Sequence, residues 1–159
     1  MSAAGTLPRA ASPGPWQADP VLNSDQAWAL LSAAREECGR AGIPMSFAVM
    51  DPAGHLVAAL RTDGAPWIST DVAQGKAWTA AAYGMPSAGQ KAKMDSLPNF
   101  STALTTMTGG RFTPQPGAVP VYADGQLLGA LGASGGTGQQ DEDVCSAAVT
   151  ACGYQTSAG

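Results

Sequence analysis

The chain has 159 residues, and its 8 Lys+Arg and 12 Asp+Glu residues amount to 13% of the sequence, about half the usual share of a soluble domain. A hydrophobic content of 45% with a net charge of -4 excludes a disordered chain. The acidic balance also excludes a basic surface for nucleic acid or an anionic membrane, so we expect a small-molecule ligand. A surface this poor in charge suits burial between subunits, which predicts a homo-oligomer, either a dimer or a dimer-based assembly.

The chain has no apolar run near the roughly 20 residues of a membrane-spanning helix, and its N-terminus lacks the apolar core of a signal peptide. These features predict a cytoplasmic protein. Residues 1–20 are rich in Ala, Gly and Pro without periodicity. They predict a flexible N-terminal extension at 1–22, followed by one domain at 23–155 and a tail at 156–159. The three scattered cysteines favour reduced thiols over a disulfide framework.

The first predicted elements are a helix and a hairpin. Asn23 or Ser24 can cap a helix whose apolar residues recur with helical spacing up to Gly42. Two short apolar segments, 45–50 and 55–60, flank a turn that contains Pro and Gly. Such a turn reverses the chain sharply, which predicts two paired strands.

Helices are predicted in the middle of the chain. Ser69 or Thr70 can cap a second helix that ends at Gly84. Residues 87–90 have the spacing of a capping box, which predicts a short third helix, and 99–107 predict another.

A second hairpin and a last helix complete the predicted order. Residues 109–117 are rich in Gly and Pro and predict a loop. The segments 119–122 and 126–133 flank an Asp-Gly turn, which is a strong hairpin signal. A further capping-box spacing at 137–140 begins the last helix. Two hairpins separated by helices predict an α+β domain with a mainly antiparallel sheet.

Four segments of the chain resemble the GlcG/HbpS-like family, also called the haem-degrading or DUF336 domain. They are AVMDPAGHLVAALRTDGA at 48–65, KAWTAAA at 76–82, PGAVPV at 116–121 and LLGALGASGGTGQQDEDV at 127–144. The resemblance implies a single domain with a profilin-like antiparallel sheet of about five strands covered by helices. It also implies assembly through dimers, and some members of this family bind haem or a corrinoid.

Two residues depart from the family's pattern. Ala118 follows Gly117 where the family usually has Gly-Gly, and Ala133 stands where the family commonly has Val. Ala118 restricts the backbone at a loop that we expect to face the ligand.

The Gly-rich turn before the last helix is a candidate ligand site. Exposed backbone N–H groups and the positive end of the helix dipole suit a carboxylate or phosphate. The residues expected to bind it are Gly117, Ser134, Gly135, Gly136 and Thr137. The alternative is a tight structural turn in which Thr137 only caps the helix. Residues 132–136 match G-x-S-x-G, but the only His precedes Ser134, so the chain order of a serine hydrolase is absent.

Charged residues near the first hairpin are candidates for chemistry. Arg61 and Asp63 end a predicted strand, and Lys76 borders the apolar stripe of the second helix. A partly buried lysine can act as a base or clamp an anion, so we assign Lys76 and Asp63 as catalytic candidates and Arg61 as a ligand-binding one. The alternative is a structural ion pair of Lys76 with Asp63 or with Asp71.

His55 is the only histidine, and its imidazole has the chemistry of an axial haem ligand. The alternative is an ordinary surface histidine after a turn. No set of His and Cys residues has zinc-ligand spacing, so no metal site of that kind is expected. Trp67, Trp78 and other aromatic residues can line a pocket for a flat ligand or pack the core.

Three functional hypotheses follow. The first is a small-ligand-binding protein that takes haem or a related tetrapyrrole in a pocket near a subunit interface, with His55 as axial ligand. The alternative is a metal-free isomerase or lyase that moves a proton on a small carboxylate or carbonyl metabolite, with no cofactor. The third is a non-catalytic partner of another enzyme.

Overall fold

The computed structural model describes residues 20–159, in which four strands form one antiparallel sheet. The strands are β1 (Ser46–Met50), β2 (Leu56–Arg61), β3 (Ala118–Ala123) and β4 (Gln126–Ser134), in the order β2-β1-β4-β3. The predicted α+β class is confirmed, with four strands where about five were expected. Beyond β3 the sheet continues only as a single bridge between Tyr122 and Gln155.

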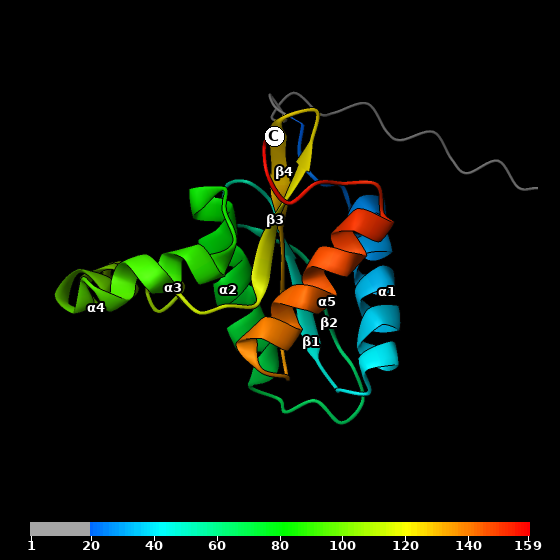
Figure 1. Cartoon of the computed structure of the whole chain (residues 1–159), viewed down its shortest axis with the longest axis horizontal. Helices are drawn as coiled ribbons and strands as arrows, with labels where there is room; N and C mark the ends of the chain where they lie inside the picture. Colours follow the sequence, from blue (N-terminus) through cyan, green and yellow to red (C-terminus); the bar gives the residue numbers. More distant parts are fainter. Residues whose placement is uncertain (1–19) are drawn as a thin grey trace, which may run out of the picture.

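Helices cover both faces of the sheet and make three layers (Figure 1). On one face lie α1 (Ser24–Ala41) and α5 (Gly138–Ala151), which pack against each other. On the other face lies α2 (Ser69–Tyr83), which contacts β4, β1 and β3. The short helices α3 (Ser87–Asp95) and α4 (Pro98–Met107) follow α2 and extend sideways from the sheet.

The two faces of the sheet carry side chains of different size. The large ones belong to the core under α1 and α5 and come from Phe47, Val49, Val119, Val121 and Leu131. The small ones belong to the core under α2 and come mainly from Ala48, Ala118 and Ala130. A Cβ at Gly132 would lie 2.4 Å from the Ala73 carbonyl oxygen, so a larger residue would push α2 off the sheet. The Ala-rich helix therefore packs with its backbone close to β4.

The predicted N-cap at Asn23 and the predicted capping box at Thr137 are confirmed, and both prove to be capping boxes. In each, the cap side chain accepts from the backbone N–H three residues on, and the glutamine there accepts from the cap N–H. These reciprocal bonds satisfy N–H groups that have no partner within the helix. The beginnings of α1 and α5 are thus fixed by local sequence.

Two other predicted caps are wrong because tertiary contacts take the hydroxyl groups. The N-cap of α2 is Ile68, and the Ser69 hydroxyl lies 2.7 Å from that of Ser46 in β1. The N-cap of α3 is a proline, and the Ser87 hydroxyl accepts from the Ala118 N–H at 3.0 Å. Both serines tie helices to the sheet instead of capping them.

The predicted N-terminal extension lies outside the described residues as far as residue 19. Of its last residues, Leu22 is buried in the core, and its N–H donates to the Leu128 carbonyl at 3.0 Å. Within the described part of the chain, no helix combines the length and apolar character needed to span a bilayer.

Candidate functional site

A buried ion pair joins helices from opposite faces of the sheet at the end of β4. Lys76 Nζ on α2 lies 2.9 Å from Asp141 Oδ2 on α5, and the two side chains are only 7% and 2% exposed. Lys76 Nζ also donates to the Ala133 carbonyl at 3.2 Å, and Asp141 Oδ1 accepts from the Gly136 N–H at 2.8 Å. Each charge is therefore paired and hydrogen-bonded, as burial requires.

Gly117 lies directly against this pair. A Cβ at this position would be 2.7 Å from Lys76 Nζ and 2.9 Å from the Asp141 Cβ, and its φ of +127° also disfavours other residues. The Cys145 thiol donates to the Gly117 carbonyl at 3.6 Å. Burial, together with nearby Asp141, raises the pKa of Cys145 well above its usual value. The thiol therefore stays protonated and does not serve as a nucleophile.

A cavity of about 510 Å³ borders the pair. Its lining comes from four segments of the chain and consists of Lys76, Ala88, Lys91, Gln115, Pro116, Ser134, Gly136, Gly138, Gln139 and Asp141. Three of the predicted site residues, Lys76, Ser134 and Gly136, thus share one cavity, with Gly117 beside it. Gly135 instead packs against the Pro44 carbonyl, and Thr137 caps α5.

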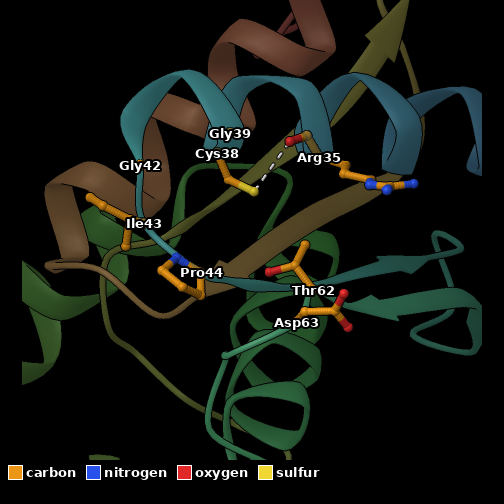
Figure 2. A pocket seen from close by; sticks show the side chains of 8 residues that line it. All are labelled: Arg35, Cys38, Gly39, Gly42, Ile43, Pro44, Thr62 and Asp63. Atoms are coloured by element: carbon orange, nitrogen blue, oxygen red, sulfur yellow. Dashed lines mark hydrogen bonds between the residues drawn. The ribbon is translucent and has the colours of Figure 1, made fainter.

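The pairs of Lys76 with Asp63 or Asp71 are wrong, because Asp141 takes that position. Asp63 lines a different cavity of about 310 Å³ at the C-terminal end of α1, where Figure 2 shows it beside Thr62 and across from Cys38. Arg61 is exposed at the end of β2 and lines none of these cavities. The structure therefore separates the expected catalytic pair of Lys76 and Asp63.

The cavity beside Asp63 contains no activated nucleophile. Its cysteine, Cys38, donates its thiol proton to the Arg35 carbonyl at 3.3 Å, as the dashed line in Figure 2 shows. Burial raises the pKa of Cys38, so the thiolate is disfavoured there as well.

The departures from the family's pattern do not face a ligand. Ala118 is fully buried in β3 under α2, where its N–H bonds to Ser87. Ala133 is fully buried in the core under α1 and α5, and only its carbonyl reaches Lys76. The expectation that Ala118 restricts a ligand-facing loop is therefore wrong.

His55 lies in the β1–β2 hairpin, beside the carboxylate of Asp51, which backbone hydrogen bonds hold in place. One oxygen of Asp51 accepts from the backbone N–H groups of Ala53 and His55, each at 2.9 Å. The other oxygen lies 3.3 Å from His55 Nδ1. The His55 side chain is 79% exposed, so the second ring nitrogen, Nε2, is open to a ligand.

A third cavity, of about 330 Å³, begins next to His55. Its lining includes both sequence neighbours of His55, together with Met50, Trp78 and Arg111. The Arg111 guanidinium lies 5.6 Å from the centre of the Trp78 ring, which is a cation–π contact. The cavity therefore offers a flat aromatic wall and a cation, and His55 lies beside its lining residues in the sequence, not in the lining itself.

Two functional contributors were not singled out from the sequence. Asp141 lies three and four residues before the buried Val144 and Cys145 on α5. A carboxylate on an apolar stripe requires a buried cation, and this signal was available. Arg111 lies in a Gly-rich loop, and no local pattern connects it to Trp78.

Among residues 20–159, no group of three or more His, Cys, Asp and Glu side chains is arranged to hold a metal ion. The three cysteines there are free, and two of them are buried. The fold and its cavities define a class of small α+β proteins with room for small molecules at the ends and edges of a four-stranded sheet.

Comparison with known proteins identifies the family within this class. The model of the family "Haem degrading protein HbpS-like" matches residues 22–150, and the chain belongs to this family. It is 38% identical over 114 residues to Protein GlcG of Escherichia coli (strain K12), covering 72% of this chain and 81% of that protein.

Two solved structures share the fold. A PduOC–haem complex superposes with a TM-score of 0.75 at 25% identity, covering 86% of this chain and 99% of that one. A double mutant of HbpS from Streptomyces reticuli gives a TM-score of 0.75 at 28% identity, covering 92% and 97%. The family likeness expected from the sequence is therefore confirmed.

We expect the buried pair of Lys76 and Asp141 to affect the stability of the fold when only one of its charges is removed. Lys76→Met leaves Asp141 buried without its cation, so we expect the free energy of unfolding to fall by about 3–5 kcal/mol. The double variant Lys76→Met, Asp141→Leu removes both charges and should recover most of this loss, because apolar pairs often replace buried ion pairs without loss. Urea denaturation followed by tryptophan fluorescence measures both, and an equal loss in the two variants would contradict the assignment.

Proposed function

We propose that this protein binds haem or a related tetrapyrrole at the hairpin face, with His55 Nε2 as the axial ligand of the iron. The observation that carries the proposal is the contact between Asp51 and His55 Nδ1. Histidines that bind metals usually donate their other N–H to a carboxylate, which fixes the tautomer and orients the ring. Asp51 is itself anchored by two backbone N–H groups, so the imidazole is oriented in advance.

The residues around His55 fit the rest of such a ligand. A tetrapyrrole supplies four nitrogens to its iron, so one imidazole is enough, as in proteins with a single proximal histidine. Trp78, Met50 and Leu56 offer apolar surface to the flat ring, and Arg111 offers a cation to a propionate. The haem complex of PduOC and the name of the matched family support this choice of ligand.

The cavity itself is near the lower limit of ligand sites, which range over roughly 300–1,000 Å³. At about 330 Å³ it encloses part of a large flat ligand and leaves the remainder exposed. A second subunit would cover that exposed part, so we place the site near a subunit interface.

Hemin titration tests the axial ligand. We expect a saturable shift of the Soret band in the wild type and at least a tenfold weaker interaction in His55→Ala, because the described chain has no other histidine to replace it. Asp51→Asn keeps the imidazole but loses the orienting carboxylate, so the affinity should fall about 10- to 100-fold.

Glu36→Gln on α1 is the matched control, since this exposed side chain lies in none of the three cavities. A Soret response in His55→Ala equal to that of Glu36→Gln would refute the axial role. No response in the wild type would remove haem from the proposal.

We further propose that a second copy of the chain covers α4. None of the ten residues of this helix is buried, and none is charged. Phe100 and Met107 on α4, with Leu97 just before it, are 50%, 77% and 43% exposed. Large exposed apolar side chains on an uncharged helix are typical of an interface.

Light scattering tests this interface. The wild type should be at least dimeric at micromolar concentration, and Phe100→Glu with Met107→Glu should reduce its mass toward that of one chain, 15.9 kDa. Glu36→Lys, which changes a charge on α1, should leave the mass unchanged. A monomeric wild type would refute the homo-oligomer, and an unchanged mass in the double variant would exclude α4 from the interface.

A metal-free isomerase or lyase is the second candidate function, with a small carboxylate or carbonyl metabolite as substrate. The observation that favours it is the buried pair of Lys76 and Asp141 at the wall of the 510 Å³ cavity. A hydrogen-bonded ammonium group and carboxylate at the wall of a cavity suit general acid–base catalysis. In this candidate Asp141 replaces Asp63 as the carboxylate beside Lys76.

Deuterium exchange tests proton transfer without knowledge of the product. In D₂O the protein should speed the loss of the C–H signal beside the carbonyl of small 2-oxo acids, seen by proton NMR. The variant Lys76→Met, Asp141→Leu should lose this acceleration while it keeps its circular dichroism spectrum. Unchanged exchange in the folded variant would reject both residues as the catalytic pair.

A further inference from the structure

The 510 Å³ cavity beside Lys76 and Asp141 contains more hydrogen-bond donors than its protein partners use. We propose that it is a second ligand site, distinct from the hairpin face, which binds a small oxyanion such as a carboxylate or a phosphate group. The location is that of the second candidate function, but binding does not require that any reaction follows.

The third N–H of Lys76 points to a missing acceptor. An ammonium group has three donors, and Lys76 Nζ gives two of them, to Ala133 and Asp141. Within residues 20–159 the third has no acceptor, although the side chain is 7% exposed and lines the cavity. A buried donor left without a partner costs about 1–3 kcal/mol. An oxygen atom in the cavity would satisfy it.

The space beside this nitrogen is kept open by a glycine. Gly117 lies where a Cβ would come within 2.7 Å of Lys76 Nζ. Glycine therefore leaves uncovered a part of the ammonium group that any other residue would occupy.

The remaining lining adds further donors. The backbone N–H groups of Gly138 and Gln139, in the first turn of α5, have no acceptor in the described part of the chain. The Ser134 hydroxyl makes no hydrogen bond with the described residues either, and it lines the same cavity. An acceptor-rich ligand matches this set, whereas a donor such as an amine does not.

The charges of the lining also favour an anionic ligand. Two cations, Lys76 and Lys91, line the cavity with one anion, Asp141. Asp95, which pairs with Lys91 at 2.6 Å, is not part of the lining. The N-terminal end of α5 adds the positive end of its dipole. Because each of the two lysines is paired with a carboxylate, the positive potential that remains comes from the N-terminal end of α5, and the volume admits a group larger than a single ion.

Calorimetric titration with three probes tests the proposal: succinate, inorganic phosphate and, as the neutral match of succinate, succinamide. We expect saturable binding of at least one anion and none of succinamide, weakened by added salt. Succinate binding identifies a carboxylate site, and phosphate binding a phosphate site. Failure of both anions, or an equal response to succinamide, overturns the proposal.

Variants locate the binding in this cavity. Ser134→Ala removes one donor without disturbing the buried pair, so the affinity should fall about 2- to 10-fold. Lys91→Gln should weaken binding about 2- to 5-fold. Lys93→Gln, which removes an exposed charge from the same helix outside the cavity, is the matched control. Equal affinities of all three variants overturn the assignment to this cavity.

The outcomes separate this inference from the proposed functions. Anion binding that is unchanged by saturation with hemin supports two independent sites, and competition between them overturns the independence of the sites. If an anion binds but the protein does not accelerate deuterium exchange, only the isomerase or lyase function is rejected. Absence of anion binding rejects both uses of the cavity and leaves the haem proposal intact.

Discussion

The ion pair between Lys76 and Asp141 is the contact on which the arrangement of the site depends. It is the point at which α2 and α5, from opposite faces of the sheet, are held to the same end of β4. Because both charges are buried, neither helix can move without exposing an unpaired charge to the core. The position of the Gly-rich turn depends on the same residue, because the Gly136 N–H donates to Asp141 Oδ1. One buried contact therefore holds together a cavity wall that is built from segments far apart in the sequence.

The difference in side-chain size between the two cores brings the two residues of this pair within reach of each other. The large side chains under α1 and α5 provide most of the apolar burial, while Ala and Gly under α2 bring that helix close to the strands. Only a helix packed so closely can direct a lysine past the end of β4. The hairpin face differs, because His55 is positioned by its own turn and needs no distant segment. Of the two candidate sites, one is thus built by tertiary packing and the other by local structure.

This difference explains what the sequence could predict. The helices, both hairpins and His55 follow from local signals such as capping boxes, Asp-Gly turns and apolar spacing, and the elements expected from them are present. The partner of Lys76 depends on which helix reaches the same end of the sheet, which no local pattern specifies. Lone charges of opposite sign on the apolar stripes of α2 and α5 would have indicated the pair. The predictions of caps at Ser69 and Ser87 are wrong for the same reason, because the hydroxyl groups of these residues form hydrogen bonds with strands of the sheet.

The outer edge of β3 limits how copies of this chain can associate. Pro120, which pairs with Ala130 of β4, has no N–H to offer on its free side, and the single bridge from Tyr122 to Gln155 covers the strand beyond it. A neighbouring molecule therefore finds no continuous row of backbone donors and acceptors on this side. Growth of the sheet from one subunit into the next is blocked there, which also protects the folded chain from aggregation through this edge. Any pairing of strands between copies is therefore directed to the opposite edge of the sheet, which β2 forms.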